Sequence, residues 1–228
     1  MIRILILTSL LFYKGEANSS PIHAIGSKSA VEALVRMLNS EDIALSPVSA
    51  RLKNTNTNEY GIFLFHRLSS PGLATRANRF QCALNYLLGD SLKTIHITLV
   101  ENDPAILISD GERAIIDIAD IERFNGHSDG DFTAFNVLLH ELYEQYQLQV
   151  VAGLRIGKIT QSQLKKAHMK AIQKESIFYS LTMLRTEADV REQYILIEFT
   201  NRVDSSRHHY YAYFQNGNIE RVEQETER

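Results

Sequence analysis

The sequence predicts an α+β fold, in which a mixed sheet with helices is followed by a C-terminal β-meander. Helical and strand-like segments alternate irregularly over the first two thirds of the chain, and the last part consists of strands alone. This order favours α+β over a regular parallel α/β sheet. With 228 residues, 44% hydrophobic and 22% charged, the composition is that of a soluble globular protein. A chain of this length can bury a sufficient core without disulfides or a structural metal.

Residues 1–17 allow two interpretations. A basic start precedes an apolar run at residues 4–13, and the small residues Gly15 and Ala17 follow two apart. These features are typical of a cleaved secretory signal peptide, in which case the protein is exported. The same run also suits a first buried β-strand, in which case the protein is cytoplasmic. The run is too short to span a membrane as a helix, and no other segment is apolar enough, so we expect no membrane span. Residues 18–228 are then expected to form one α+β domain.

Apolar periodicity predicts the elements of the first half. Ser29 and Glu32 match the capping-box pattern, and the apolar residues after them predict a helix at 29–39. Pro71 and Gly72 open a second helical pattern that ends near Gly89. Alternating or β-branched runs predict strands at 62–65, 93–100, 105–108 and 114–118.

The second half is predicted to contain two helices and then three strands. The helices are expected at 133–148 and 161–178, and the strands at 194–200, 210–215 and 219–223. The segment Asn216-Gly217-Asn218 is a turn signal between the last two strands.

The most informative local pattern is His140-Glu141-Leu142-Tyr143-Glu144. It differs from the H-E-x-x-H zinc motif only in the last residue, which is Glu144 instead of histidine. Residues four apart share one face of a helix, so His140 and Glu144 can reach the same ion, and both side-chain types bind zinc. In enzymes with the H-E-x-x-H motif the glutamate next to the first ligand is the general base, which assigns that role to Glu141. A solvated His-Glu pair on an amphipathic surface helix has the same spacing.

The following helix offers a third ligand. His168 and Glu175 lie on a mostly apolar stripe of residues 161–178, and polar groups in such a position need partners when buried. His168 completes a set of two histidines and one carboxylate, as in several catalytic zinc sites. Glu175 is placed to orient a ligating histidine through a hydrogen bond, without binding the metal itself. The alternative is a histidine that only donates a hydrogen bond to a carbonyl.

These segments resemble a known group of domains. His140 to Tyr146, followed by Ala167-His168-Met169-Lys170-Ala171, is similar to the pattern H-E-h-x-E-x-Y … A-H-x-x-A. That pattern occurs in predicted metallopeptidase-like toxin domains at the C-termini of Rhs-repeat proteins. The resemblance covers residues 132–175 and implies a zincin-like fold with an active-site helix. It also implies His140, Glu144 and His168 as metal ligands and Glu141 as the base, with Tyr146 among the supporting residues.

Charge and cysteine content exclude several other classes. The net charge is −3 and the pI about 6.2, so nucleic acid is not an expected partner. The single cysteine, Cys82, can form neither an internal disulfide nor a cysteine-rich zinc site. The leading hypothesis is a metal-dependent hydrolase, a zincin-like zinc peptidase that acts on a protein or peptide substrate.

Two points stay open at this stage. The alternative function is a non-catalytic exported or host-interaction module that keeps the fold without metal chemistry. Because a carboxylate replaces the second histidine, manganese or another divalent metal is also compatible with the ligand set.

Overall fold

The computed structural model describes eight parts of the chain: residues 21–39, 48–64, 83–84, 86–87, 94–125, 133–175, 181–202 and 204–227. The N-terminal segment 1–17 and most of the second helical pattern lie outside these residues. Within them, no helix is long and apolar enough to cross a membrane.

The described elements form a mixed α+β structure with two sheets. Its helices are α1 (Lys28–Leu38), α3 (Ile118–Glu122), α4 (Ala134–Gln145), the π-helix η1 (Tyr146–Val151) and α5 (Gln161–Glu175). The first sheet contains β1 (Ile22–Ile25), β2 (Val48–Asn54), β3 (Glu59–Leu64), β4 (Ile95–Val100), β5 (Ser109–Asp110) and β6 (Ile115–Asp117). The second contains β7 (Leu181–Asp189), β8 (Tyr194–Asn201), β9 (Arg207–Gln215) and β10 (Asn218–Glu227).

The first sheet is mixed, as predicted. Its strand order is β2-β3-β1-β4-β6-β5, with parallel pairs β1/β4 and β4/β6 and antiparallel pairs elsewhere. The short β5 lies at one edge. Alternation along β4 explains its position in the middle: Ile95, Ile97 and Leu99 are buried, and His96 between them is exposed.

The second sheet is the predicted β-meander, with one more strand than expected. Its order β10-β9-β8-β7 is entirely antiparallel between neighbours. The turn at Asn216 and Gly217 has positive φ at both residues, as the asparagine-glycine pair predicts. A Cβ at Gly217 would lie 2.0 Å from the carbonyl oxygen of Pro104, so this turn also needs glycine for its close approach to the rest of the molecule.

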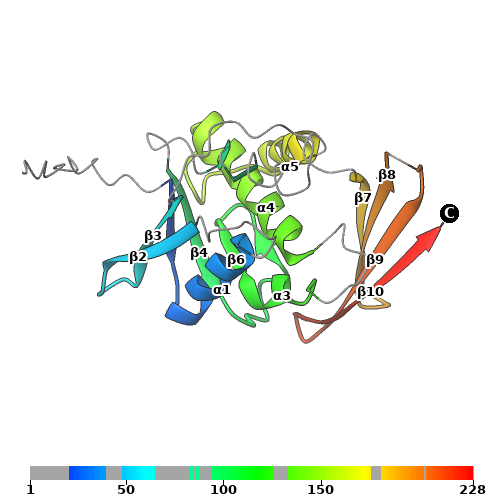
Figure 1. Ribbon diagram of the computed structural model, residues 1–228, viewed down its shortest axis with the longest axis horizontal. Helices are drawn as coiled ribbons and strands as arrows, with labels where there is room; N and C mark the ends of the chain where they lie inside the picture. The colour runs from blue at the N-terminus through cyan, green and yellow to red at the C-terminus, as the bar shows by residue number, and fades with distance from the viewer. Residues whose placement is uncertain are drawn as a thin grey trace, which may run out of the picture.

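The helices lie between the two sheets. Figure 1 shows α1, α3 and α4 with the strands β2, β3 and β4 on one side and the C-terminal sheet β7–β10 on the other. One continuous cluster of buried side chains joins these layers, and it includes Leu34 of α1, Ile95 of β4, Leu138 of α4 and Ile197 of β8. The core therefore extends from one sheet, through the helices, to the other.

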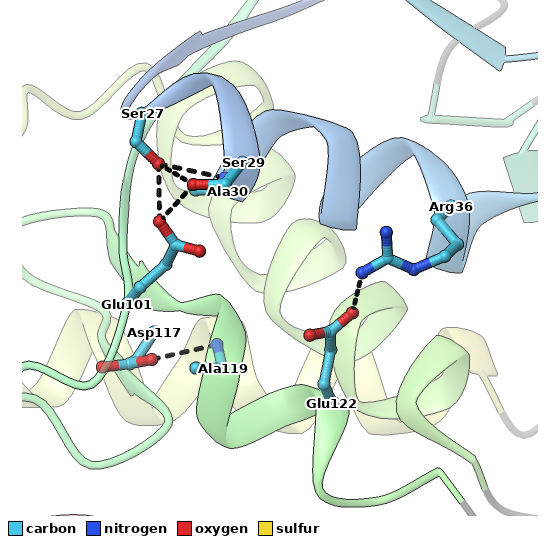
Figure 2. Close-up of polar contacts among 8 residues, drawn as sticks. All are labelled: Ser27, Ser29, Ala30, Arg36, Glu101, Asp117, Ala119 and Glu122. Carbon is cyan, nitrogen blue, oxygen red and sulfur yellow. Dashed lines mark hydrogen bonds and ion pairs between the residues drawn. The ribbon is translucent and has the colours of Figure 1, made fainter.

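Polar contacts fix the ends of the helices that flank this core. Ser27 caps α1 by accepting the N–H of Ala30 at 3.0 Å, two residues before the cap that the sequence pattern indicated. The Glu101 carboxylate accepts the hydroxyls of Ser27 (2.6 Å) and Ser29 (2.8 Å), which places a negative charge at the positive end of the helix. At the other end, Arg36 donates to Glu122 of α3, so α1 and α3 are joined at the surface (Figure 2).

The predicted helix at 133–148 continues past the α-helical part. The α-helix ends at Gln145, and the chain goes on as η1 to Val151. Within η1, Gln149 binds the backbone of His96 with both ends of its amide, each at 2.8 Å. The wider π-turn therefore lies directly beside β4, where this side chain takes the place of a neighbouring strand.

Candidate metal centre

Helix α4 presents His140 and Glu144 on one face. The helix begins at Ala134 after a capping box, in which the Thr133 N–H donates to the side-chain oxygen Oδ1 of Asn136 at 2.8 Å. Four residues separate His140 from Glu144, so the two side chains lie one turn apart on the same side. Only 7% of His140 and 6% of Glu144 is exposed, because α5 covers this face.

Helix α5 supplies the third residue. Thr160 and Gln163 form a reciprocal cap at its start, with the Thr160 N–H donating to Gln163 Oε1 at 2.9 Å. The small residues Ala167 and Ala171 are buried, which lets the two helices approach closely. His168 lies between these alanines on the same side, and its side chain reaches α4 while about a third of it stays exposed.

The three side chains converge on one point. His168 Nδ1 lies 3.0 Å from His140 Nε2 and 3.0 Å from Glu144 Oε2, and one ligand atom of each residue lies within 4.8 Å of the others. Ligand atoms around a tetrahedral zinc are roughly 3.4 Å apart, given bond lengths of about 2.0–2.2 Å. The two separations that involve His168 are about 0.4 Å shorter than this value, and all three ligand atoms lie within 4.8 Å of one another, so side-chain shifts of up to about an ångström bring them to the spacing of a zinc site.

Glu144 is held by its surroundings as well as by His168. A Cβ on Gly111 would lie 2.7 Å from Glu144 Oε1, so only glycine leaves room for the carboxylate in this position. The neighbouring Gln145 donates to the Gly111 carbonyl oxygen at 3.0 Å and accepts from Gln149 at 2.9 Å. The segment after β5 is therefore bonded to α4 through Gln145, and it packs directly against the buried Glu144 carboxylate.

Glu141 lies beside the ligands, on the wall of a cavity of about 200 Å³. The Glu141 carboxylate accepts a hydrogen bond from Ser109 of β5. Burial raises the pKa of Glu141 to about 7, and the negative charge of Glu144 acts in the same direction. His140 and His168 line the same cavity, so Glu141, the base assigned from the sequence, and two of the candidate ligands border one cavity.

The two supporting residues have different environments. Tyr146 is buried in the core, and its ring centroid lies 5.2 Å from that of Tyr86. Glu175 is the last residue of α5, and its side chain lies outside the described part of the chain. The roles assigned to Tyr146 and Glu175 stay predictions.

Sequence reasoning missed Ser109, Gly111 and Gln145. The Asp110-Gly111 pair signals a turn, but nothing in the sequence connects that turn with Glu144, more than thirty residues away. The cavity walls from β7 and β8 were also unforeseen. Comparison of the chain with protein-family models, with curated proteins and with solved structures finds no match.

Proposed function

We propose that the protein is a metal-dependent hydrolase, a zincin-like peptidase whose metal is held by His140, Glu144 and His168. The observation that carries this proposal is the convergence of these three ligand atoms within 4.8 Å, beside a cavity that Glu141 also lines. A surface His-Glu pair without function would not need a third ligand from a second helix. Two nitrogens and one oxygen form a ligand set common to catalytic zinc sites, which leave one position for water or substrate.

Each residue of the site has a role in this proposal. A bound divalent metal supplies a Lewis acid that makes water more acidic and polarises a carbonyl oxygen. Glu141 takes a proton as the water oxygen adds to the carbonyl carbon of the peptide bond. When the C–N bond breaks, Glu141 passes that proton to the departing amine. Ser109 holds the Glu141 carboxylate, and Gly111 leaves room for Glu144.

The first test measures bound metal. Protein purified without chelator and supplied with zinc is expected to retain about one zinc per chain by elemental mass spectrometry. The His140→Ala and His168→Ala variants are expected to lose it. His96→Ala is the matched control, because His96 also pairs with a histidine, His23, at a centroid distance of 5.0 Å. A wild-type protein without metal, or loss of metal only in His96→Ala, would overturn the proposed site.

The second test measures hydrolysis. The zinc-loaded protein is incubated with a diverse peptide mixture, and new termini are identified by mass spectrometry. Glu141→Gln is expected to keep its zinc and to lose cleavage by at least about a hundredfold, since general-base catalysis contributes on that order. Equal cleavage by wild type and Glu141→Gln would show that Glu141 is not the general base. A zinc-loaded wild type that cleaves no peptide would favour a metal-binding module without catalysis.

A further inference from the structure

The cavity beside the candidate ligands is a pocket enclosed by several elements, and most of its lining is apolar. Its volume is about 200 Å³, and it is formed by six segments: the turn before β5, β5, α4, α5, β7 and β8. The residues that line it are Leu107, Ile108, Ser109, Val137, His140, Glu141, His168, Met183, Thr186, Ile195 and Ile197.

Most of this lining is aliphatic. Val137, Ile195 and Ile197 are at most 9% exposed, and Leu107, Ile108 and Met183 add further apolar surface. Among the lining residues that the structure describes there is no lysine or arginine, and their one carboxylate, Glu141, lies on the α4 side. A cavity of about 150 Å³ lined by aliphatic side chains stays dry and holds a benzene molecule. A pocket of this size and composition therefore suits one uncharged side chain up to the size of phenyl.

The C-terminal sheet provides one wall. Ile195 and Ile197 lie on the same face of β8, and Thr186 of β7 is the direct partner of Ile197 in the antiparallel pair. This sheet contributes no ligand to the candidate metal centre. Its contribution to the site is the apolar surface that faces His140 and Glu141.

Another part of the wall, formed by Leu107 and Ile108, contains a strained turn. Ile108 has φ +64°, in the left-handed region that β-branched residues rarely adopt, and the Ser109 N–H donates to the Leu107 carbonyl oxygen across it at 2.8 Å. Asp120 accepts the Ile108 N–H at 3.1 Å, and the Ile108 carbonyl oxygen accepts the Asp117 N–H at 2.8 Å. Backbone strain that is held in place by several hydrogen bonds is typical of ligand-binding sites.

We propose that this pocket receives an uncharged aliphatic or phenyl side chain of the substrate, next to the peptide bond that is cleaved. The C-terminal sheet is then the element that selects the substrate. This inference rests on the proposed metal-dependent hydrolysis, because it places the side chain next to a carbonyl held at the metal. Peptides with leucine, methionine or phenylalanine at this position are the expected substrates, and peptides with lysine, arginine, aspartate or glutamate are excluded.

The test uses zinc-loaded protein and a series of hydroxamic acids, R–CO–NHOH, measured by calorimetry. The R groups are methyl, isobutyl, benzyl, 2-carboxyethyl and 3-aminopropyl, which share the zinc-binding group and differ only in the side chain. Burying the additional carbon atoms predicts that isobutyl and benzyl bind at least about tenfold more tightly than methyl. The two charged groups are expected to bind no more tightly than methyl. Equal affinities across the series would overturn the inference.

A matched pair of variants on β8 locates the effect. Ile197 faces the pocket, whereas its neighbour Leu196 is equally buried on the opposite face of the strand. Ile197→Ala is expected to reduce the isobutyl-to-methyl ratio at least ~3-fold, because the enlarged pocket no longer encloses the smaller group. Leu196→Ala removes a comparable side chain and is expected to leave the ratio unchanged. An equal loss in both variants would mean that the preference arises from general destabilisation.

A separate measurement distinguishes failure of this inference from failure of the proposed function. Metal-free protein with labelled isoleucine methyl groups is titrated with the N-acetyl amides of leucine, phenylalanine, lysine and glutamate. The methyl signals of Ile195 and Ile197 are expected to shift with the first two amides only, and Ile22 and Ile62 in the core serve as internal controls. Zinc binding without these shifts would overturn the pocket alone. Shifts in a protein that binds no zinc would overturn the hydrolase and, with it, the placement of the side chain beside a scissile bond.

Discussion

Asp120 and Ile219 join the two halves of the molecule, because the Asp120 carboxylate accepts the backbone N–H of Ile219 at 2.7 Å. The second carboxylate oxygen accepts the N–H of Ile108, and the aspartate is 1% exposed. Burial raises the pKa of Asp120, while the two hydrogen bonds act in the opposite direction. A single side chain on α3 therefore holds both the start of β10 and the strained turn of the pocket.

Replacing Asp120 is expected to destabilise the fold strongly. Asp120→Ala leaves the buried N–H groups of Ile108 and Ile219 without this acceptor, at a cost of roughly 1–3 kcal/mol each. Chemical denaturation should therefore show a loss of about 2–6 kcal/mol in the free energy of unfolding. Asp120→Asn keeps one acceptor oxygen and should lose less than Asp120→Ala. If Asp120→Ala unfolds at the same denaturant concentration as wild type, the aspartate does not stabilise this junction.

Gly111→Ala tests the position of Glu144. The added methyl group would lie 2.7 Å from Glu144 Oε1 and 2.5 Å from Leu164 Cδ1. Both atoms are ends of flexible side chains, so we expect only a small change in the thermal midpoint. The displaced carboxylate should weaken zinc binding by at least ~10-fold, in the range found when residues that support metal ligands are altered. Competition with a zinc chelator measures this affinity, and unchanged binding would show that Glu144 tolerates the shift.

Glu144→Gln separates the charge of the carboxylate from its shape. The amide is a poorer ligand for zinc than the carboxylate, so the zinc affinity should fall at least ~10-fold. The free energy of unfolding of the metal-free protein should fall only slightly, because the amide oxygen can still accept a hydrogen bond from His168 and no buried negative charge remains. The two quantities are measured by chelator competition and urea denaturation. Full zinc affinity in Glu144→Gln would exclude Glu144 as a ligand.

His23 predicts a pH dependence of stability that is separate from the metal centre. Its ring faces Glu59 of β3 (Nδ1 to Oε1, 3.0 Å), Lys53 of β2 (Nε2 to Nζ, 2.8 Å) and His96 of β4. Burial lowers the pKa of His23 below 6.5, and the charges of Lys53 and His96 add to this effect while Glu59 opposes it.

The direction of the dependence follows from proton linkage. Just below pH 6.5 the unfolded chain binds a proton at residue 23 that the folded protein does not, so acid favours the unfolded state. The contribution is complete above pH 6.5 and is lost as the pH falls through the lowered pKa. His23→Gln should therefore reduce the slope of unfolding free energy against pH between about pH 7 and pH 5. Urea denaturation at several pH values measures the slope, and an unaltered slope in the variant would contradict the assignment.

The long periodic elements were predictable from the sequence, and the short or irregular ones were not. Apolar residues recur at helical spacing over at least two turns in α1, α4 and α5. They alternate with polar residues along parts of β8, β9 and β10. The four residues of β1 offer too short a pattern, although tertiary contacts place this strand between β3 and β4. Strand β7 was missed, and a register shift between Met183 and Arg185 interrupts its alternation.

One expected strand is a turn for a reason connected with the site. The apolar run at residues 105–108 predicts a strand, but it contains a turn with Ile108 in the left-handed region. Leu107 and Ile108 line the apolar pocket. A pocket wall needs apolar side chains, so the segment has the same composition as a buried strand. The helical spacing of the sequence indicated His140, Glu144 and His168 as site residues. The positions of Gly111 and of the β8 wall depend on contacts between segments far apart in the sequence, which local patterns do not predict.

The bond between Asp120 and Ile219 has a consequence for the order of folding. The candidate ligands His140 and His168 are separated by 28 residues, and the two neighbouring helices that hold them need little loop closure to meet. The Asp120 contact spans 99 residues, and β10 follows the other described strands in the sequence. During synthesis, α4 and α5 are followed by β7 and β8, which line the pocket, and then by β10, whose Ile219 binds Asp120. We therefore expect a nascent chain to acquire the capacity to bind metal first and the capacity to select a side chain last.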